Sequence, residues 1–114
     1  SHPQFANLLR LKSAATHELG LLDEEKDGAT VKIGGIIEST RRTFTKKNGH
    51  EMAFLAIADE NGIAAECIVF PQVFTEYKDL LIKGSVIIID GQIDAKSDKP
   101  MIIVKRIQPV HFSS

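Results

Sequence analysis

The sequence is poor in the features that would mark a disulfide-bonded, membrane-spanning or strongly basic protein. It has a single cysteine, so no internal disulfide can form. No apolar run approaches the ~18 residues that a membrane-spanning helix requires. The formal net charge is -1 and the pI about 6.4, which excludes a generally basic protein that coats nucleic acid. With 43% hydrophobic residues among 114, we expect one soluble domain with one core.

Residues arranged for chemistry are also missing. The four histidines are scattered without metal-ligand spacing, and no glycine-rich phosphate loop joins a strand to a helix. Cys67 has no adjacent base in the sequence and is expected to be a small core residue. Asp90 and Asp94 are four residues apart on one strand, where solvated carboxylates are the expected state. We therefore predict no catalytic residue, no metal and no cofactor, and, without a signal peptide, a cytoplasmic location.

Positive charge is concentrated in one place. Residues 41–47 carry four cations and no acid, whereas residues 18–27 carry five acids against one lysine. A charge run is usually a solvated surface, and that alternative stays open. Because these cations flank the expected turn at Asn48-Gly49, they also predict a surface that binds phosphate groups.

Hydrophobic periodicity predicts a short helical segment followed by a β domain. Residues 1–28 form the expected N-terminal helical segment and linker, and residues 29–114 the domain. Strands are predicted at 31–37, 52–57, 63–69, 85–94 and 101–107. A helix is predicted to begin at Pro71 and to end at Gly84, and the pair Gly34-Gly35 to permit a bulge or a tight bend.

Three strands, a helix and two strands is the element order of the OB-fold, an all-β five-stranded Greek-key barrel. In this fold the outer face of strands 2 and 3, together with the loops 1–2 and 4–5, is the usual oligonucleotide-binding surface. A basic groove with an exposed aromatic side chain suits single-stranded nucleic acid. The residues that this arrangement would place there are Arg41, Arg42, Phe44, Lys46, Lys47, Phe54, Glu66, Lys96 and Lys99.

The two aromatic candidates have alternatives. Placing Leu55 and Ile57 inside the barrel turns Phe54 outward, since side chains alternate along a strand. Phe54 could instead pack beneath the N-terminal helix, as an aromatic residue on a strand more often belongs to a core. Phe44 would either stack on a base or cap the end of the barrel.

From Val31 to Ile107 the chain resembles the OB domain in the C-terminal region of the bacterial DNA polymerase III α subunit. The family pattern includes a basic Thr-Lys-Lys hairpin, a Met-Ala-Phe strand and a Val-Phe-Pro junction before a helix with a tyrosine. The matching residues here are Gly35-Ile36, Arg42, Thr45-Lys46-Lys47, Gly49, Met52-Ala53-Phe54, Asp59, Gly62, Val69-Phe70-Pro71, Tyr77 and Gly91-Gln92-Ile93, and Ser1-His2-Pro3 resembles the start of this region.

The resemblance implies a non-catalytic piece of a replicative polymerase that binds single-stranded template DNA without reading its sequence. The basic residues would contact phosphates and Phe54 would stack on a base. Expected partners are single-stranded DNA, the rest of the polymerase chain and the replisome subunits, with no membrane, in the bacterial cytoplasm at the nucleoid. The isolated domain is expected to be a monomer.

Departures from the pattern leave alternatives open. Asn48 lengthens the hairpin by one residue, residues 62–66 look one residue long, and Ala58 stands where an acid is common, so the register between strands 2 and 3 is undecided. The same fold binds tRNA anticodons in class II aminoacyl-tRNA synthetases, and OB barrels also serve as protein-docking modules. Residues 2–5 also match the core of a streptavidin-binding tag, although the apolar segment that continues from them favours a native start.

Overall fold

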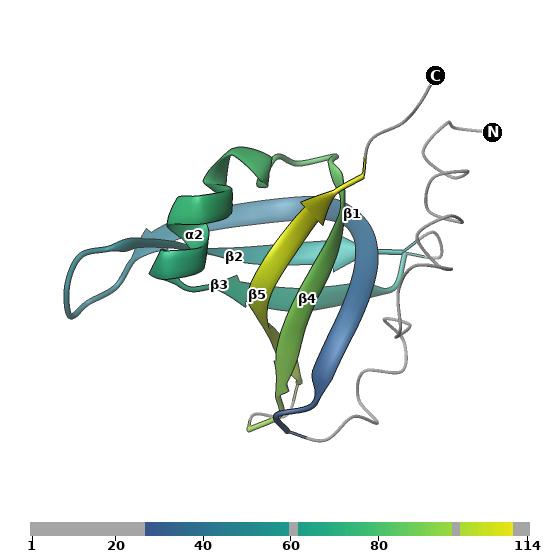
Figure 1. The fold of residues 1–114 in the computed structure, drawn as a ribbon, viewed down its shortest axis with the longest axis horizontal. Helices are drawn as coiled ribbons and strands as arrows, with labels where there is room; N and C mark the ends of the chain where they lie inside the picture. Colours follow the sequence, from purple (N-terminus) through teal and green to yellow (C-terminus); the bar gives the residue numbers. More distant parts are fainter. Residues whose placement is uncertain (1–26, 60–61, 97–98, 111–114) are drawn as a thin grey trace.

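The chain folds into a closed β-barrel with one helix. The structure is a computed structural model that describes residues 27–59, 62–96 and 99–110. Its elements are β1 (Thr30–Phe44), β2 (Glu51–Ala58), β3 (Ala64–Val69), α2 (Pro71–Tyr77), the 3-10 turn η2 (Lys78–Leu80), β4 (Val86–Asp94) and β5 (Met101–Pro109), as Figure 1 shows. The strand order around the barrel is β1-β2-β3-β5-β4. The predicted OB-fold, with its helix between strands 3 and 4, is confirmed. The predicted N-terminal helix and the boundary at residues 28 and 29 stay predictions, because residues 1–26 lie outside the described part.

One long, bent strand closes the barrel. The first half of β1 pairs with β4, and its second half, from Ile36 onward, pairs with β2. All strand pairs are antiparallel except β3 with β5, which is parallel. The pairing with β4 is regular through Gly34 and Gly35, and the register shift against β2 falls at Glu38. The glycine pair therefore sits near the change of partner strand, but the predicted bulge lies three residues after Gly35.

Gly35 serves a close approach of two strands. A Cβ atom at this position would stand 2.6 Å from the carbonyl oxygen of Ala58 on β2. Real Cβ atoms essentially never come this close to an oxygen, so only glycine fits where β1 crosses to its second partner.

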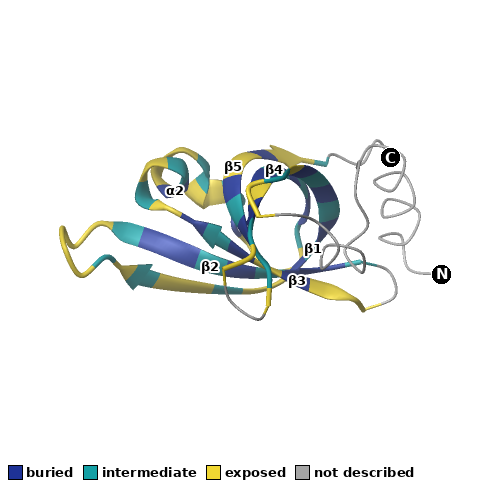
Figure 2. Cartoon of the chain, turned by 90° about the horizontal axis from the view of Figure 1, so that it is seen from below, coloured by how far each residue is buried: buried dark blue, intermediate teal, exposed yellow. Residues whose placement is uncertain are grey.

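The core follows the alternation along each strand. Figure 2 shows buried residues inside the barrel and exposed residues at the hairpin and the loops. The largest fully buried side chains include isoleucines from β1, β2, β4 and β5, together with Phe74 from α2, which is 2% exposed. Fully buried Cys67, predicted to be a core residue, is one of them. The helix thus places one aromatic ring into the end of the barrel.

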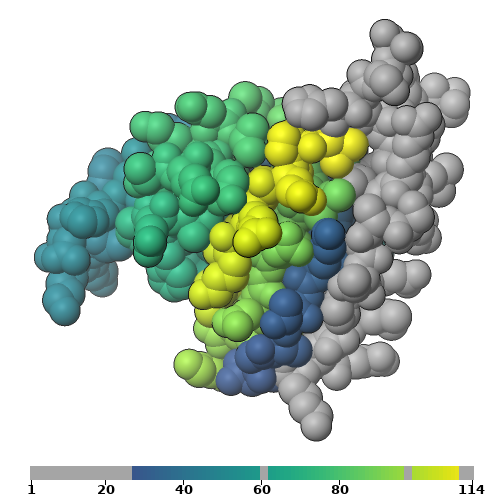
Figure 3. Space-filling model, viewed as in Figure 1, coloured from purple at the N-terminus to yellow at the C-terminus, as the bar shows by residue number. Residues whose placement is uncertain are grey.

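The helix is shorter than its apolar spacing predicts. It begins at Pro71 as expected, but α2 ends at Tyr77 and continues only as the 3-10 turn η2. The chain then turns toward β4 at Gly84, which has φ +92° and whose N–H donates to Ile37 O. Leu81 lies in this connecting segment and is buried, so its apolar side chain reflects tertiary packing and not a longer helix. Figure 3 shows α2 and η2 beside β5, with the β1–β2 hairpin projecting past them.

Candidate nucleic-acid interface

The outer face of β2 presents Phe54, as the alternation predicts. Its neighbours Leu55 and Ile57 are 2% and 0% exposed, and Phe54 itself is only partly buried. Phe54 pairs with Arg41 on β1 and with Ile68 on β3. The pairing of β2 with β3 is regular over its length, which settles the register that the sequence left open.

Arg41 lies directly over the ring of Phe54. The distance from the guanidinium carbon of Arg41 to the ring centroid of Phe54 is 4.7 Å. Such contacts contribute about 0.5–1 kcal/mol at exposed sites. The aromatic candidate for base stacking is therefore already covered on one side by a planar cation.

Beyond Phe54 the same face carries a row of partly buried apolar side chains. Ile68 pairs with Phe54 across β2 and β3, and Ile103 pairs with Ile68 across the parallel β3–β5 junction. Glu66 is exposed on this face, opposite Ala56. The outward direction of Ile68 could be predicted from its alternation with Cys67. The position of Ile103 beside it depends on barrel closure and has no local sequence signal.

The basic tract is divided by the structure. The sequence placed Arg41, Arg42 and Phe44 in a loop, but all three belong to β1, which extends to Phe44. Consecutive strand residues point to opposite faces, so Arg42 points away from Phe54. Its guanidinium carbon lies 5.4 Å from the ring centroid of Phe74, and its Nη1 atom is 4.0 Å from a carboxylate oxygen of Glu51. Arg42 is thus separated from Arg41 by the strand itself.

A pocket lies on the Arg42 side, between the hairpin and α2. It has a volume of about 350 Å³ and is lined by His50, Glu51, Pro71, Gln72, Phe74, Thr75 and Lys78. Its lining holds one lysine and one glutamate, whereas the opposite face combines Arg41 with apolar neighbours. The two sides of the hairpin therefore differ in chemistry.

The hairpin tip holds two lysines in a hydrogen-bonded turn. Lys46 and Lys47 are exposed. The N–H of Thr45 donates to His50 O at 2.9 Å, and the N–H of Gly49 donates to Thr45 O at 2.9 Å. Gly49 has φ +65°, the conformation predicted for the Asn-Gly turn.

Phe44 stands near this tip at the end of β1. Its side chain is 64% exposed, so it does not cap the barrel, and that alternative is wrong. It alternates with Thr43 and therefore shares the Arg42 side of the strand. Whether it contacts nucleic acid stays a prediction.

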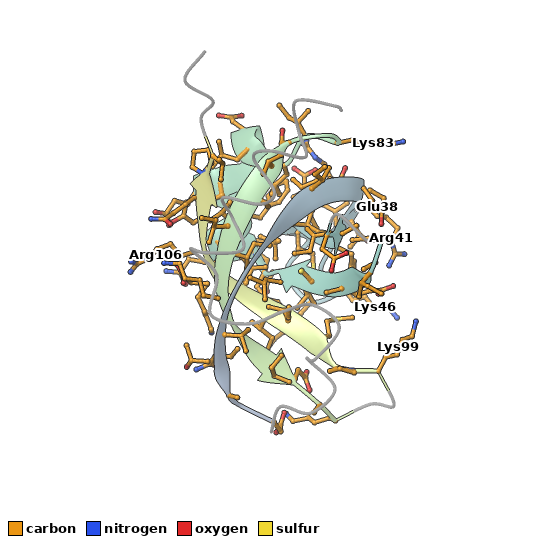
Figure 4. The ribbon with its side chains drawn as sticks, turned by 90° about the vertical axis from the view of Figure 1, so that its right-hand side faces the viewer. Glu38, Arg41, Lys46, Lys83, Lys99 and Arg106 are labelled. Carbon is orange, nitrogen blue, oxygen red and sulfur yellow. The ribbon has the colours of Figure 1, made fainter. Side chains whose placement is uncertain are left out.

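The β4–β5 loop contributes the other two predicted lysines. Lys96 and Lys99 are exposed, and the N–H of Lys96 donates to Oδ1 of Asp94 at 3.1 Å. Figure 4 shows Arg41, Lys46 and Lys99 on one side of the barrel and Arg106 on the opposite side. Because Arg41 lies over Phe54, this is the side of the barrel that Phe54 faces. Glu38 and Lys83 lie on it as well.

In the part of the chain that the structure describes, the one cysteine is buried and the metal-binding side chain types are not grouped. Burial, and secondarily the charge of Glu66, raises the pKa of the Cys67 thiol to about 12, so it stays protonated. Within residues 27–59, 62–96 and 99–110, no three His, Cys, Asp or Glu side chains are grouped so as to hold a metal ion. In the same part of the chain, neither helix is long and apolar enough to cross a membrane.

Comparison with known proteins gives matches of two kinds in sequence. Residues 31–110 match the tRNA anti-codon family, described as OB-fold nucleic acid binding domain. The chain is 33% identical over 82 residues to DNA polymerase III subunit alpha of Borreliella burgdorferi, which is 72% of this chain and 7% of that protein. It is 28% identical over 117 residues to the same subunit of Aquifex aeolicus, which is 98% of this chain and 10% of that protein. The chain therefore spans a tenth or less of these two relatives.

Solved structures give the same fold at low identity. An OBody bound to hen egg-white lysozyme superposes with a TM-score of 0.67 at 18% identity, covering 86% of this chain and 95% of that one. The single-stranded DNA binding protein of Thermus aquaticus superposes with a TM-score of 0.62 at 16% identity, covering 75% of this chain and 41% of that one. These likenesses show the barrel and not what it binds.

Proposed function

The chain belongs to the family of OB-fold nucleic acid binding domains, and from that premise we propose that it binds single-stranded DNA without sequence specificity. The observation that carries the proposal is the outward Phe54 with Arg41 over its ring, and with Lys46 and Lys99 on the same side of the barrel as Arg41. Stacking on an aromatic ring tolerates any base, because every base has a π-face. Lysines at the edges of the face would hold the phosphates by charge alone.

The parent protein in this proposal is a replicative DNA polymerase. It is supported by the matches to DNA polymerase III subunit alpha, of which this chain would be one segment. The segment would be non-catalytic and hold template strand, while the polymerase active site would lie elsewhere in the parent. Its partners would be the rest of that chain and the replisome subunits, in the bacterial cytoplasm, and the isolated domain would be a monomer.

The placement of the cations sets the expected salt dependence. Four exposed lysines, Lys46, Lys47, Lys96 and Lys99, lie in the two loops. Each phosphate contact on a single strand contributes about -0.7 to the slope of log affinity against log salt, so four contacts give about -2.8. Affinity should then fall roughly 50-fold between 50 and 200 mM salt. With so few contacts we expect a dissociation constant in the micromolar range or weaker.

The test is fluorescence anisotropy of a labelled single-stranded DNA oligonucleotide titrated with the domain at these two salt concentrations. Phe54→Ala should weaken binding by about 5- to 150-fold, the loss of about 1–3 kcal/mol of stacking. The double variant Lys46→Glu/Lys47→Glu should weaken it and flatten the salt slope. Arg106→Gln removes one charge from the opposite side of the barrel and is the control, expected to bind nearly as the wild type does. Phe44→Ala measures how much the remaining aromatic candidate, Phe44, contributes to the affinity.

Competition separates this proposal from its alternatives. Duplex DNA should compete poorly with the single strand. If the domain prefers a hairpin RNA to the DNA strand, its function is anticodon-type RNA binding and not the binding of template DNA. Absence of binding to any nucleic acid at low salt would overturn the proposal and leave a protein-docking module.

A further inference from the structure

Arg41 does not have the surroundings of a phosphate-binding arginine. Lys46 lies at a loop tip, whereas Arg41 lies on a strand. The guanidinium carbon of Arg41 is 4.7 Å from the centroid of the Phe54 ring. The two residues are direct partners in the β1–β2 ladder, so their backbones hold them side by side. Arg41 is nevertheless exposed, so a ligand in solvent can reach its side chain.

A base that approaches Phe54 from outside meets the guanidinium first. Moving the guanidinium aside would lose the contact with the ring, about 0.5–1 kcal/mol, and expose a ring face only to cover it again. Stacking on the guanidinium keeps the contact and adds a second one. Guanidinium is planar, delocalised and weakly hydrated, and bases stack on it as they do on aromatic rings.

We propose that Arg41 is a base-stacking residue, with a nucleobase on the outer side of its guanidinium and the Phe54 ring on the inner side. This inference rests on the proposed single-strand binding and assigns a different role to one of its cations. Phe54 then acts partly through Arg41, because it holds the guanidinium flat beneath the base. The phosphate contacts are left to the lysines of the two loops.

Lysine at position 41 distinguishes stacking from a phosphate contact made by charge alone. Arg41→Lys keeps the charge but removes the plane, so a charge contact would survive it and a stacked base would not. A bidentate phosphate contact would also be lost, and the double-mutant cycle and the fluorescence of a stacked base separate that case. We expect Arg41→Lys to weaken single-strand binding at least fivefold, close to the loss in Arg41→Ala. The matched control is Arg106→Lys, at an exposed arginine on the opposite side of the barrel, which should bind as the wild type does. Circular dichroism of each variant confirms that the barrel is folded.

Two further readouts separate the roles. A double-mutant cycle between Arg41→Ala and Phe54→Ala should be strongly non-additive, since both residues belong to one stack. The fluorescence of an oligonucleotide that contains 2-aminopurine should be quenched by stacking when the wild type binds it. The quenching should be smaller when Arg41→Lys binds it. If Arg41→Lys binds the strand with the affinity of the wild type, or if the losses in the cycle are additive, the stacking role is overturned while the proposed function is left intact. Failure of the wild type to bind single-stranded DNA would overturn both.

Discussion

Replacing Gly35 with alanine should strain the closure of the barrel. The added Cβ would stand 2.6 Å from the carbonyl oxygen of Ala58, and 3.2 Å from its carbonyl carbon. To restore an ordinary contact, that distance must grow from 2.6 Å to about 3.4 Å. Both contacting groups are backbone, so no side-chain rotation relieves the clash, and β1 and β2 must move apart next to the paired residues Ile36 and Ala58.

The magnitude follows from two opposing effects. Overpacking a well-packed interior costs about 1–3 kcal/mol, and the rigid backbone neighbours favour the upper part of that range. Alanine also lowers the entropy of the unfolded chain, which offsets about 0.4–1 kcal/mol. We expect Gly35→Ala to lower the free energy of unfolding by about 2 kcal/mol, a fall in Tm of roughly 10 °C.

Urea unfolding followed by far-UV circular dichroism measures this change, because the chain has no tryptophan to report it by fluorescence. Gly49→Asn is the control: nothing lies within 4 Å of a Cβ there, and asparagine tolerates its φ of +65°. The positive φ still strains asparagine slightly, so this variant should cost less than about 1 kcal/mol, well below the loss in Gly35→Ala. A loss below about 0.5 kcal/mol in Gly35→Ala, or an equal loss in both variants, would refute the close-approach argument.

Two other positions give independent tests. Burial raises the pKa of the Cys67 thiol from 9.0 to about 12. Between these two values the unfolded chain binds fewer protons than the folded chain. The free energy of unfolding of the wild type should therefore fall with rising pH by up to about 1.4 kcal/mol per pH unit, relative to that of Cys67→Ala. Parallel pH profiles of the two proteins would contradict this. Oδ1 of Asp27 accepts a hydrogen bond of 2.9 Å from the N–H of Ala95, so Asp27→Ala should cost about 0.5–1.5 kcal/mol and speed hydrogen exchange at Ala95. Asp27→Asn keeps an acceptor and should retain most of the protection; equal exchange in both variants would argue against this bond.

Much of the fold could be predicted because its signals are local. The alternation from Ala53 to Ile57 decides which side chains enter the barrel, and it turned Phe54 outward correctly. Asn48-Gly49 marks a turn because asparagine and glycine tolerate its backbone angles. The proline that opens α2 is a similarly local signal.

The site was harder to predict because its arrangement depends on pairing between strands. The polar end of β1 has exposed side chains on both sides, so no alternation of polarity reveals that Arg41 and Arg42 lie on a strand. The shift of register at Glu38 then determines that Arg41, and not Thr40, pairs with Phe54, and so which of the two arginines shares the face of Phe54. A one-residue slip would exchange their faces.

The sequence by itself determined the number and order of the strands, the side of each that is buried, and a local excess of positive charge, since these depend on side-chain periodicity and on residue type. Only the tertiary structure decided which cation covers Phe54 and which apolar residues continue its face. The junction of Ile68 with Ile103 joins strands that are distant in the chain. Such neighbours are set by the closure and register of the whole barrel, which no short stretch of sequence encodes.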